Sequence, residues 1–127
     1  MYTKLEIDFA ELKINHLQGT CIRKNLPFDI TLEQMLLLLS ITHCQATGIE
    51  LSFPSGRRGH VYNTRTFDRI DHKKGYVYDN ILVVSQIFNN KKALYEDTRN
   101  RKYLLKKGQN IIEVVKDIVL QSIKDIE

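Results

Sequence analysis

The sequence has few cysteines, no tryptophan and no long hydrophobic run. Its two cysteines, Cys21 and Cys44, form no CxxC pair, so the paired pattern typical of a zinc site is missing. The longest apolar run, Met35 to Leu39, is far too short to cross a bilayer. The N-terminus carries charges of both signs instead of a basic end followed by an apolar run, which argues against a signal peptide. We therefore expect a cytoplasmic protein without a membrane segment, in which both thiols are reduced.

The positive charge lies in the middle of the chain. Residues 57–107 hold thirteen Lys or Arg and five Asp or Glu, a net charge of +8, whereas the flanks carry −4. Such a basic centre favours binding to a nucleic-acid backbone, because each phosphate that a Lys or Arg neutralises releases counterions. The alternative for any single lysine is a merely soluble surface. The predicted phosphate contacts are Arg57, Arg58, Arg65, Lys73, Lys74, Lys91 and Lys92.

The stretch from Phe67 to Lys92 predicts a strand, a turn, a second strand and a helix. Residues 66–70 alternate as a strand does, and Gly75 lies in a turn, where glycine accepts backbone angles that other residues avoid. Residues 81–84 form a β-branched run of strand length. Ser85 is a plausible N-cap for the helix that follows.

Two oxygen-bearing side chains in this stretch predict a metal site. Asp68 lies near the end of the first strand and Asn89 in the first turns of the helix, so the two could face one another. Two oxygen ligands with several open positions suit Mg²⁺ (or Mn²⁺), which keeps waters and binds phosphate. One such ion can stabilise the charge that builds on a cleaved phosphodiester. The alternative for each residue alone is a capping role in a loop or helix start.

The motif resembles the His-Asn-His (HNH) family of ββα-metal nucleases, especially its small phage and prophage members. The likeness consists of DRID at 68–71, GY at 75–76, DN at 79–80, and then Asn89 and Lys92. It extends upstream to FDIT at 28–31 and to Cys44, Thr47 and Gly48, and covers roughly residues 10–100.

The resemblance implies a fold and an activity. The fold would be α+β, with a helical lead-in (1–50) and a ββα-metal motif (60–97). The chain length by itself predicts a single domain over residues 1–127, and the pattern of its last segment predicts a C-terminal helix (109–127). The activity would be metal-dependent hydrolysis of DNA phosphodiester bonds by a phage-encoded endonuclease in the bacterial host cell. Many such nucleases carry a structural zinc on two cysteine pairs, but the positions near Ser85 and Phe88 hold no cysteine, so we expect none here.

The family's catalytic roles carry over to this sequence with one departure. Asp68 falls at the metal-ligand acid, Asn80 at the middle Asn that ties the loop to the strand, and Asn89 at the third, metal-binding position. Where most members have the His that activates water, this chain has Arg69. A guanidinium is charged at any ordinary pH and makes a poor general base.

Three interpretations of Arg69 remain open. Arg69 binds the scissile phosphate while another group, or metal-bound water, supplies the nucleophile. In the second interpretation, His72 is the group that supplies the nucleophile. Asp71 and His72 form an Asp-His pair, and an imidazole titrates near neutral pH, although the loop from His72 to Asn89 is short for the family. In the third, the fold is kept for binding nucleic acid or protein after cleavage was lost.

The flanking segments predict helices. Thr31 and Gln34 form a capping box, so a helix begins at Leu32. The segment from Tyr2 to Leu17 fits a strand or a helix, and the family likeness favours a helix. A second N-cap pattern at Asn110 opens a helix that is apolar over more than half its circumference. Such a helix either packs deep against its own domain or pairs with a copy, giving a homodimer.

Overall fold

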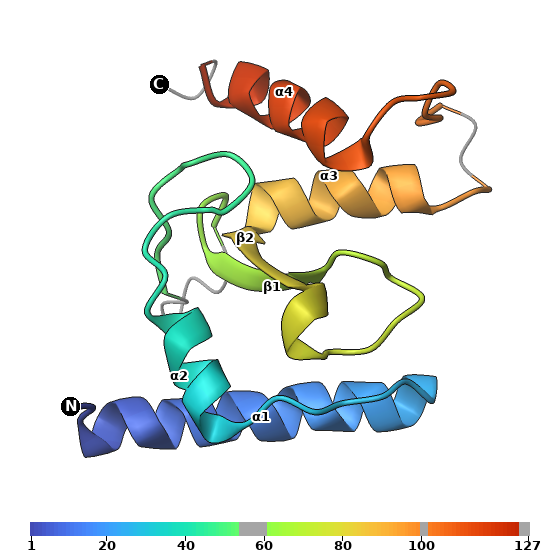
Figure 1. The fold of residues 1–127 in the computed structure, drawn as a ribbon. Coiled ribbons are helices and arrows are strands. Elements are labelled where there is room, and N and C mark those ends of the chain that lie inside the picture. The colour runs from blue at the N-terminus through green and yellow to red at the C-terminus, as the bar shows by residue number, and fades with distance from the viewer. Residues whose placement is uncertain (54–60, 100–101, 125–127) are drawn as a thin grey trace. The chain divides into compact units, whose positions relative to one another are not determined.

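The structure is a computed structural model that describes residues 1–53, 61–99 and 102–124. Its described part holds four α-helices, one short 3-10 helix and a two-stranded antiparallel sheet, in the order shown in Figure 1. The predicted α+β class and the order of strand, turn, strand and helix are thereby confirmed. Two predicted phosphate contacts, Arg57 and Arg58, lie outside the described residues. The elements are α1 (Lys4–Lys24), α2 (Leu32–Leu39), β1 (Arg65–Arg69), η1 (Tyr78–Asn80), β2 (Ile81–Ser85), α3 (Gln86–Glu96) and α4 (Ile111–Lys124).

Contacts between residues divide the chain into two compact units. The first unit holds Met1–Thr42 and Asp68–Leu82, and the second holds His43–Phe67 and Val83–Glu127. The boundary between the units therefore falls inside both strands of the sheet. Among the described helices, none combines the length and hydrophobicity that a bilayer crossing requires.

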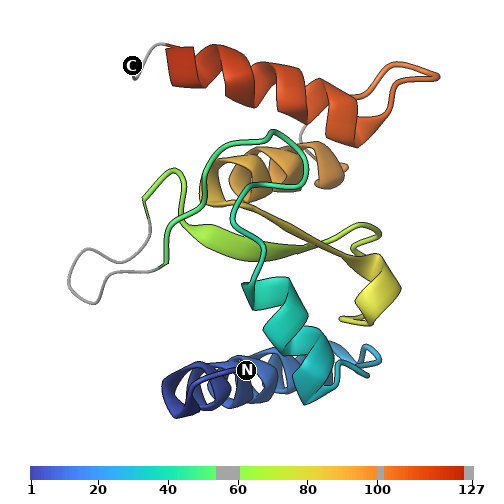
Figure 2. The same ribbon diagram turned by 60° about the vertical axis from the view of Figure 1, so that its left-hand side comes forward.

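The first unit is built on two packed helices, α1 and α2 (Figure 2). Thr3 and Glu6 form a capping box at the start of α1, and Asn25 ends the helix in the left-handed conformation that Asn tolerates. The expected capping box of Thr31 and Gln34 starts α2. The predicted start of α2 at Leu32 and the helical N-terminal segment are both confirmed. The buried side chains of the two helices are Ala10, Leu17, Cys21, Met35, Leu36 and Leu38.

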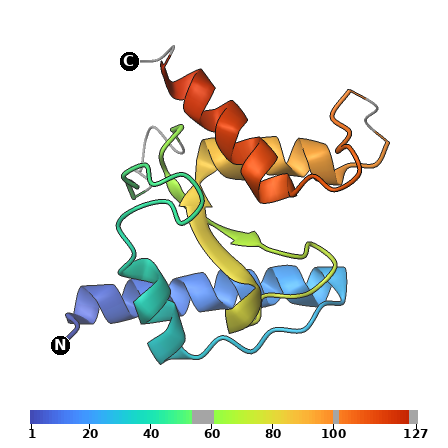
Figure 3. The ribbon, with the colours of Figure 1, turned by 45° about the horizontal axis from the view of Figure 1, so that its top comes forward.

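In the second unit, α4 packs against α3 (Figure 3). Ser85 caps α3 by accepting a hydrogen bond from the Phe88 amide, and Asn110 caps α4 by accepting from the Ile112 and Glu113 amides. Both helix starts are as predicted. On α4 the buried side chains recur every four residues and form one face: Val115, Val119 and Ile123. This face packs within the chain's own unit, and homodimerisation through α4 stays a prediction.

Candidate active site

Asn80 ties the loop between the strands to the start of β2. Its side chain is buried, and Oδ1 accepts a hydrogen bond from the Asp71 amide at 2.9 Å. Its Nδ2 donates to the carbonyls of Asp71 at 3.1 Å and Gly75 at 3.0 Å. The Asn80 carbonyl also accepts from the Ile70 amide at 2.9 Å. The loop tie expected of this residue is therefore present, whereas its part in catalysis stays a prediction.

Asp71 shapes the first turn of this loop. One carboxylate oxygen accepts from the Lys73 amide at 3.0 Å, and the backbone carbonyl accepts from the Lys74 amide at 3.0 Å. This is the local turn chemistry that Asp side chains provide. His72 lies between these residues and is exposed. The Asp71 carboxylate thus has a partner in the loop backbone, which weakens its assignment as the orienting acid of His72.

Gly75 is needed for a different reason from the one predicted. Among the described glycines only Gly48 and Gly108 have positive φ, so the expected unusual backbone angle at Gly75 is wrong. Instead, a Cβ at this position would lie 1.7 Å from the Pro27 carbonyl oxygen. The neighbouring residues continue the approach, because Phe28 and Tyr76 form a parallel bridge. Only a residue without a side chain lets the lead-in segment and the loop meet this closely.

Arg69 contacts two residues of the same loop, Lys74 and Tyr76. Its Nη1 donates to the Lys74 carbonyl at 3.3 Å, and its guanidinium carbon lies 5.5 Å from the centre of the Tyr76 ring. Burial raises the pKa of the Tyr76 hydroxyl; the positive charge of Arg69 opposes this rise and the negative charge of Asp68 adds to it. Asp68 is itself buried, with 4% of its surface exposed. The first unit therefore gathers Asp68, Arg69, Tyr76 and Asn80 around one loop.

Asn89 belongs to the second unit. It is half-buried on α3, and its Nδ2 lies 3.4 Å from the Thr66 hydroxyl. Since the oxygen and nitrogen of an amide lie on opposite sides of its Cγ, this contact turns Oδ1 away from Thr66. That oxygen is the atom a hard cation would use. Asp68 and Asn89 lie in different units, and their pairing at one ion stays a prediction.

The predicted metal site stays a prediction. Among the described residues, no three His, Cys, Asp or Glu side chains gather in a way that would hold a metal. The two predicted ligands, Asp68 and Asn89, would supply one carboxylate oxygen and one amide oxygen. Such a donor set suits Mg²⁺ or Mn²⁺.

Two of the residues predicted to contact phosphate are buried. Lys92 is fully buried on α3, and its ammonium forms an ion pair with Glu96 at 2.8 Å. Arg65 is 8% exposed, its guanidinium lies 4.0 Å from the centre of the Phe53 ring, and burial lowers its pKa. Both cations have contacts within the second unit, and their burial argues against a phosphate contact, which stays a prediction for both.

Of the other described residues predicted to contact phosphate, two are exposed and one is half-buried. Lys73 and Lys74 are exposed on the loop that Asn80 ties down, and Lys91 is half-buried on α3. Sequence reasoning missed three contacts around these residues: Pro27 against Gly75, Arg69 against Tyr76, and Thr66 against Asn89. Only the Arg69–Tyr76 pair had a signal in the sequence, a cation and an aromatic residue flanking one turn.

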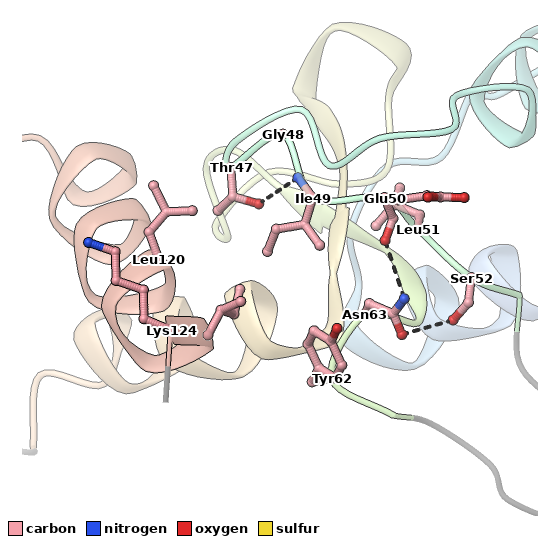
Figure 4. A pocket seen from close by; sticks show the side chains of 11 residues that line it. Thr47, Gly48, Ile49, Glu50, Leu51, Ser52, Tyr62, Asn63, Leu120 and Lys124 are labelled. Atoms are coloured by element: carbon pink, nitrogen blue, oxygen red, sulfur yellow. Dashed lines mark hydrogen bonds between the residues drawn. The ribbon is translucent and has the colours of Figure 1, made fainter. Parts of the chain in front are cut away.

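A separate pocket of about 840 Å³ lies in the second unit (Figure 4). Asn63 holds its rim by donating to the Glu50 carbonyl and accepting from the Ser52 hydroxyl. Leu120, Ile123 and Lys124 of α4 also line it. None of the predicted site residues is among its lining, so this pocket does not extend the candidate active site.

The fold is similar to that of an HNH restriction endonuclease. That protein is the rare-cutting enzyme PacI, whose solved structure matches with a TM-score of 0.58 at 16% sequence identity. The match covers 89% of this chain and 78% of that one. No family model and no curated protein matches the sequence. At this level of identity the likeness shows the fold alone.

Proposed function

We propose that this chain is an HNH-type endonuclease that hydrolyses phosphodiester bonds in DNA. The supporting observation is the structural likeness to an HNH restriction endonuclease over 89% of the chain. The loop around Asn80 adds to this support, because it holds two exposed lysines, Lys73 and Lys74, in the same unit as the buried Asp68.

In this proposal each of the predicted site residues has its own role. Asp68 would hold Mg²⁺ or Mn²⁺, with Asn89 as the predicted second ligand, and the ion would supply positive charge that stabilises the negative charge developing on the phosphate. Lys73 and Lys74 bind the DNA backbone. Asn80 positions the loop. His72, exposed on that loop, accepts the proton of the attacking water, a task for which an imidazole is suited near neutral pH.

A second function, binding without cleavage, is favoured by one specific observation. The Arg69 side chain is used inside the loop, where it contacts the Lys74 carbonyl and the Tyr76 ring. It is permanently charged and accepts no proton. Most family members have a His at this position that activates water. If Arg69 replaced that His and no other group activated the water, the chain would bind nucleic acid or a protein partner without turnover.

Nicking of a supercoiled plasmid tests the enzyme proposal. The protein is incubated with the plasmid in Mg²⁺ or Mn²⁺, beside an Asp68→Asn variant and an Asp79→Asn control that removes an exposed acid from the same unit. We expect nicking by the parent and by Asp79→Asn, and none by Asp68→Asn. Equal traces in all three would identify a contaminating nuclease. Plasmid binding without nicking by the parent would favour the second function.

The identity of the base is tested by separate substitutions at His72 and Arg69. If His72 accepts the proton, His72→Ala loses about a hundredfold or more in rate, in the range that general base catalysis contributes. A Lys73→Ala control on the same loop should lose affinity and little rate at saturating DNA. If His72→Ala keeps the parent's rate, His72 is not the base. A higher rate in Arg69→His would show that an imidazole at position 69 is able to act.

A further inference from the structure

The helix α1 carries two apolar faces, one buried and one exposed to a large extent. The covered face holds Ala10, Leu17 and Cys21, all buried. The other face begins at Tyr2, just before the helix, and continues with Leu5, Phe9 and Leu12. These four side chains, called here the α1 stripe, are 39%, 80%, 41% and 68% exposed.

The spacing makes the stripe a continuous patch. Intervals of three, four and three residues place its members on one side of a helix, in the a and d positions of a heptad. Single exposed apolar residues are normal on a protein surface, but a row of large ones marks an interaction site. The helix that sequence analysis favoured for pairing is different, because no described residue of α4 is among the exposed large apolar side chains. The α1 stripe is a row of such exposed side chains along a single helix.

The charges beside the stripe fit a second α1. Lys13 and Glu6 lie along one edge of it and Asp8 along the other. In an antiparallel pair Lys13 faces Glu6 of the second copy, and in a parallel pair it faces Asp8. Burial lowers the pKa of the Lys13 ammonium, so a carboxylate brought opposite it offsets part of that desolvation. Either orientation therefore brings opposite charges together at the edge of an apolar seam.

We propose that the α1 stripe is a self-association surface, covered in solution by the α1 stripe of a second copy of this chain. The surface is isologous, since the same residues serve both partners. A seam of about three helical turns is smaller than the roughly 800 Å² per partner of a standard interface, so we expect a weak, concentration-dependent dimer. This inference is independent of nuclease activity.

Sedimentation of the full-length chain over rising protein concentration tests the proposal. The parent, of 14.9 kDa, should shift from monomer to dimer. Leu5→Glu and Leu12→Glu place charges in the seam and should each weaken dimerisation by about tenfold or more, equivalent to about 1.4 kcal/mol. Ile22→Glu is the matched control, because Ile22 is 75% exposed on α1 outside the stripe. Circular dichroism checks that each variant is folded.

Two results would overturn the proposal. One is a parent that stays monomeric at every concentration tested. The other is a dimer that survives Leu5→Glu and Leu12→Glu but dissociates with Val114→Glu on α4, which would assign self-association to the C-terminal helix. Loss of the dimer in the two stripe variants alone, with Ile22→Glu and Val114→Glu unchanged, supports the α1 seam.

Discussion

Asn80 holds Asp71 at two points: the Asp71 amide donates to Oδ1, and Nδ2 donates to the Asp71 carbonyl. The side-chain amide therefore satisfies a backbone donor and a backbone acceptor of one residue, as a paired strand would. This fixes the beginning of the loop to the beginning of β2. The loop that carries Lys73 and Lys74 is thus held by a buried side chain and not by its own sequence alone.

Removal of the Asn80 side-chain amide, which clamps the loop at Asp71 and Gly75, should destabilise the folded state. In Asn80→Ala three buried or half-buried bonds are lost, and we expect the free energy of unfolding to fall by about 1–3 kcal/mol. Urea unfolding followed by circular dichroism measures this. Asp79→Ala, the exposed neighbour, should stay within about 0.5 kcal/mol of the parent. Equal stability of the two variants would show that the clamp contributes nothing.

A methyl group at Gly75 should be poorly tolerated. Its Cβ would overlap the backbone of Pro27, which cannot rotate away as a side chain can, so Gly75→Ala should cost about 1–3 kcal/mol or more. Gly19→Ala is the contrasting variant: it lies inside α1, and its nearest neighbour would be the Arg23 side chain at 3.6 Å. There we expect a gain of about 0.5–1 kcal/mol from helix propensity. Thermal unfolding of the pair should move in opposite directions.

The buried ion pair on α3 should be sensitive to the loss of one partner. Lys92→Met leaves Glu96 without its cation, although Glu96 is partly exposed, so the cost should fall below the ~3–5 kcal/mol of a fully buried pair. The double variant Lys92→Met/Glu96→Leu should recover much of that loss. Chemical denaturation of the single and double variants measures both steps. A double variant less stable than Lys92→Met would mean that the two side chains do not act as a pair.

Salt dependence separates true phosphate contacts from buried cations. If Lys73 and Lys74 each contact a phosphate, Lys73→Ala and Lys74→Ala should each lower the slope of log affinity against log salt by about one. Fluorescence anisotropy with labelled duplex DNA gives this slope. Lys4→Ala, an exposed lysine on α1, serves as the control and should leave it unchanged. Identical slopes in all variants would remove the loop from the DNA contact.

Tyr76 should make stability depend on alkaline pH. Burial raises the pKa of its hydroxyl above the usual 10.0, so the folded chain holds this proton more tightly than the unfolded chain does. The contribution is constant below about pH 10 and is lost as the pH rises through the folded-state value. Tyr76→Phe should therefore lose less stability than the parent between about pH 9 and about pH 11. Parallel slopes for the two proteins would contradict this.

Helix starts were predictable because their signals are local. The Thr31–Gln34 capping box, Ser85 and Asn110 each act within three residues along the chain, and the structure has all three as expected. The burial of Lys92 was not predicted, because burial depends on packing, although Glu96 four residues later offered a signal of an ion pair. The need for glycine at position 75 depends on Pro27, a distant residue that no local pattern connects to the turn.

For the candidate site, sequence reasoning placed the loop and its tether correctly but did not foresee the burial of two cations. Asn80 was expected to connect loop and strand, and its hydrogen bonds do so. Arg65 and Lys92 were assigned to phosphate because charge in a sequence does not reveal depth. The pairing of Asp68 with Asn89 at an ion remains a prediction, since it requires residues from two units to meet.

The burial of both thiols has a practical consequence for spectroscopy. Cys21 is 1% exposed and Cys44 is 3% exposed, so neither should react quickly with a maleimide dye while the chain is folded. A Lys73→Cys variant would then take up a fluorophore selectively on the loop without removal of the native cysteines. The arrival of a nucleic acid at that loop could be followed in real time by the change in emission.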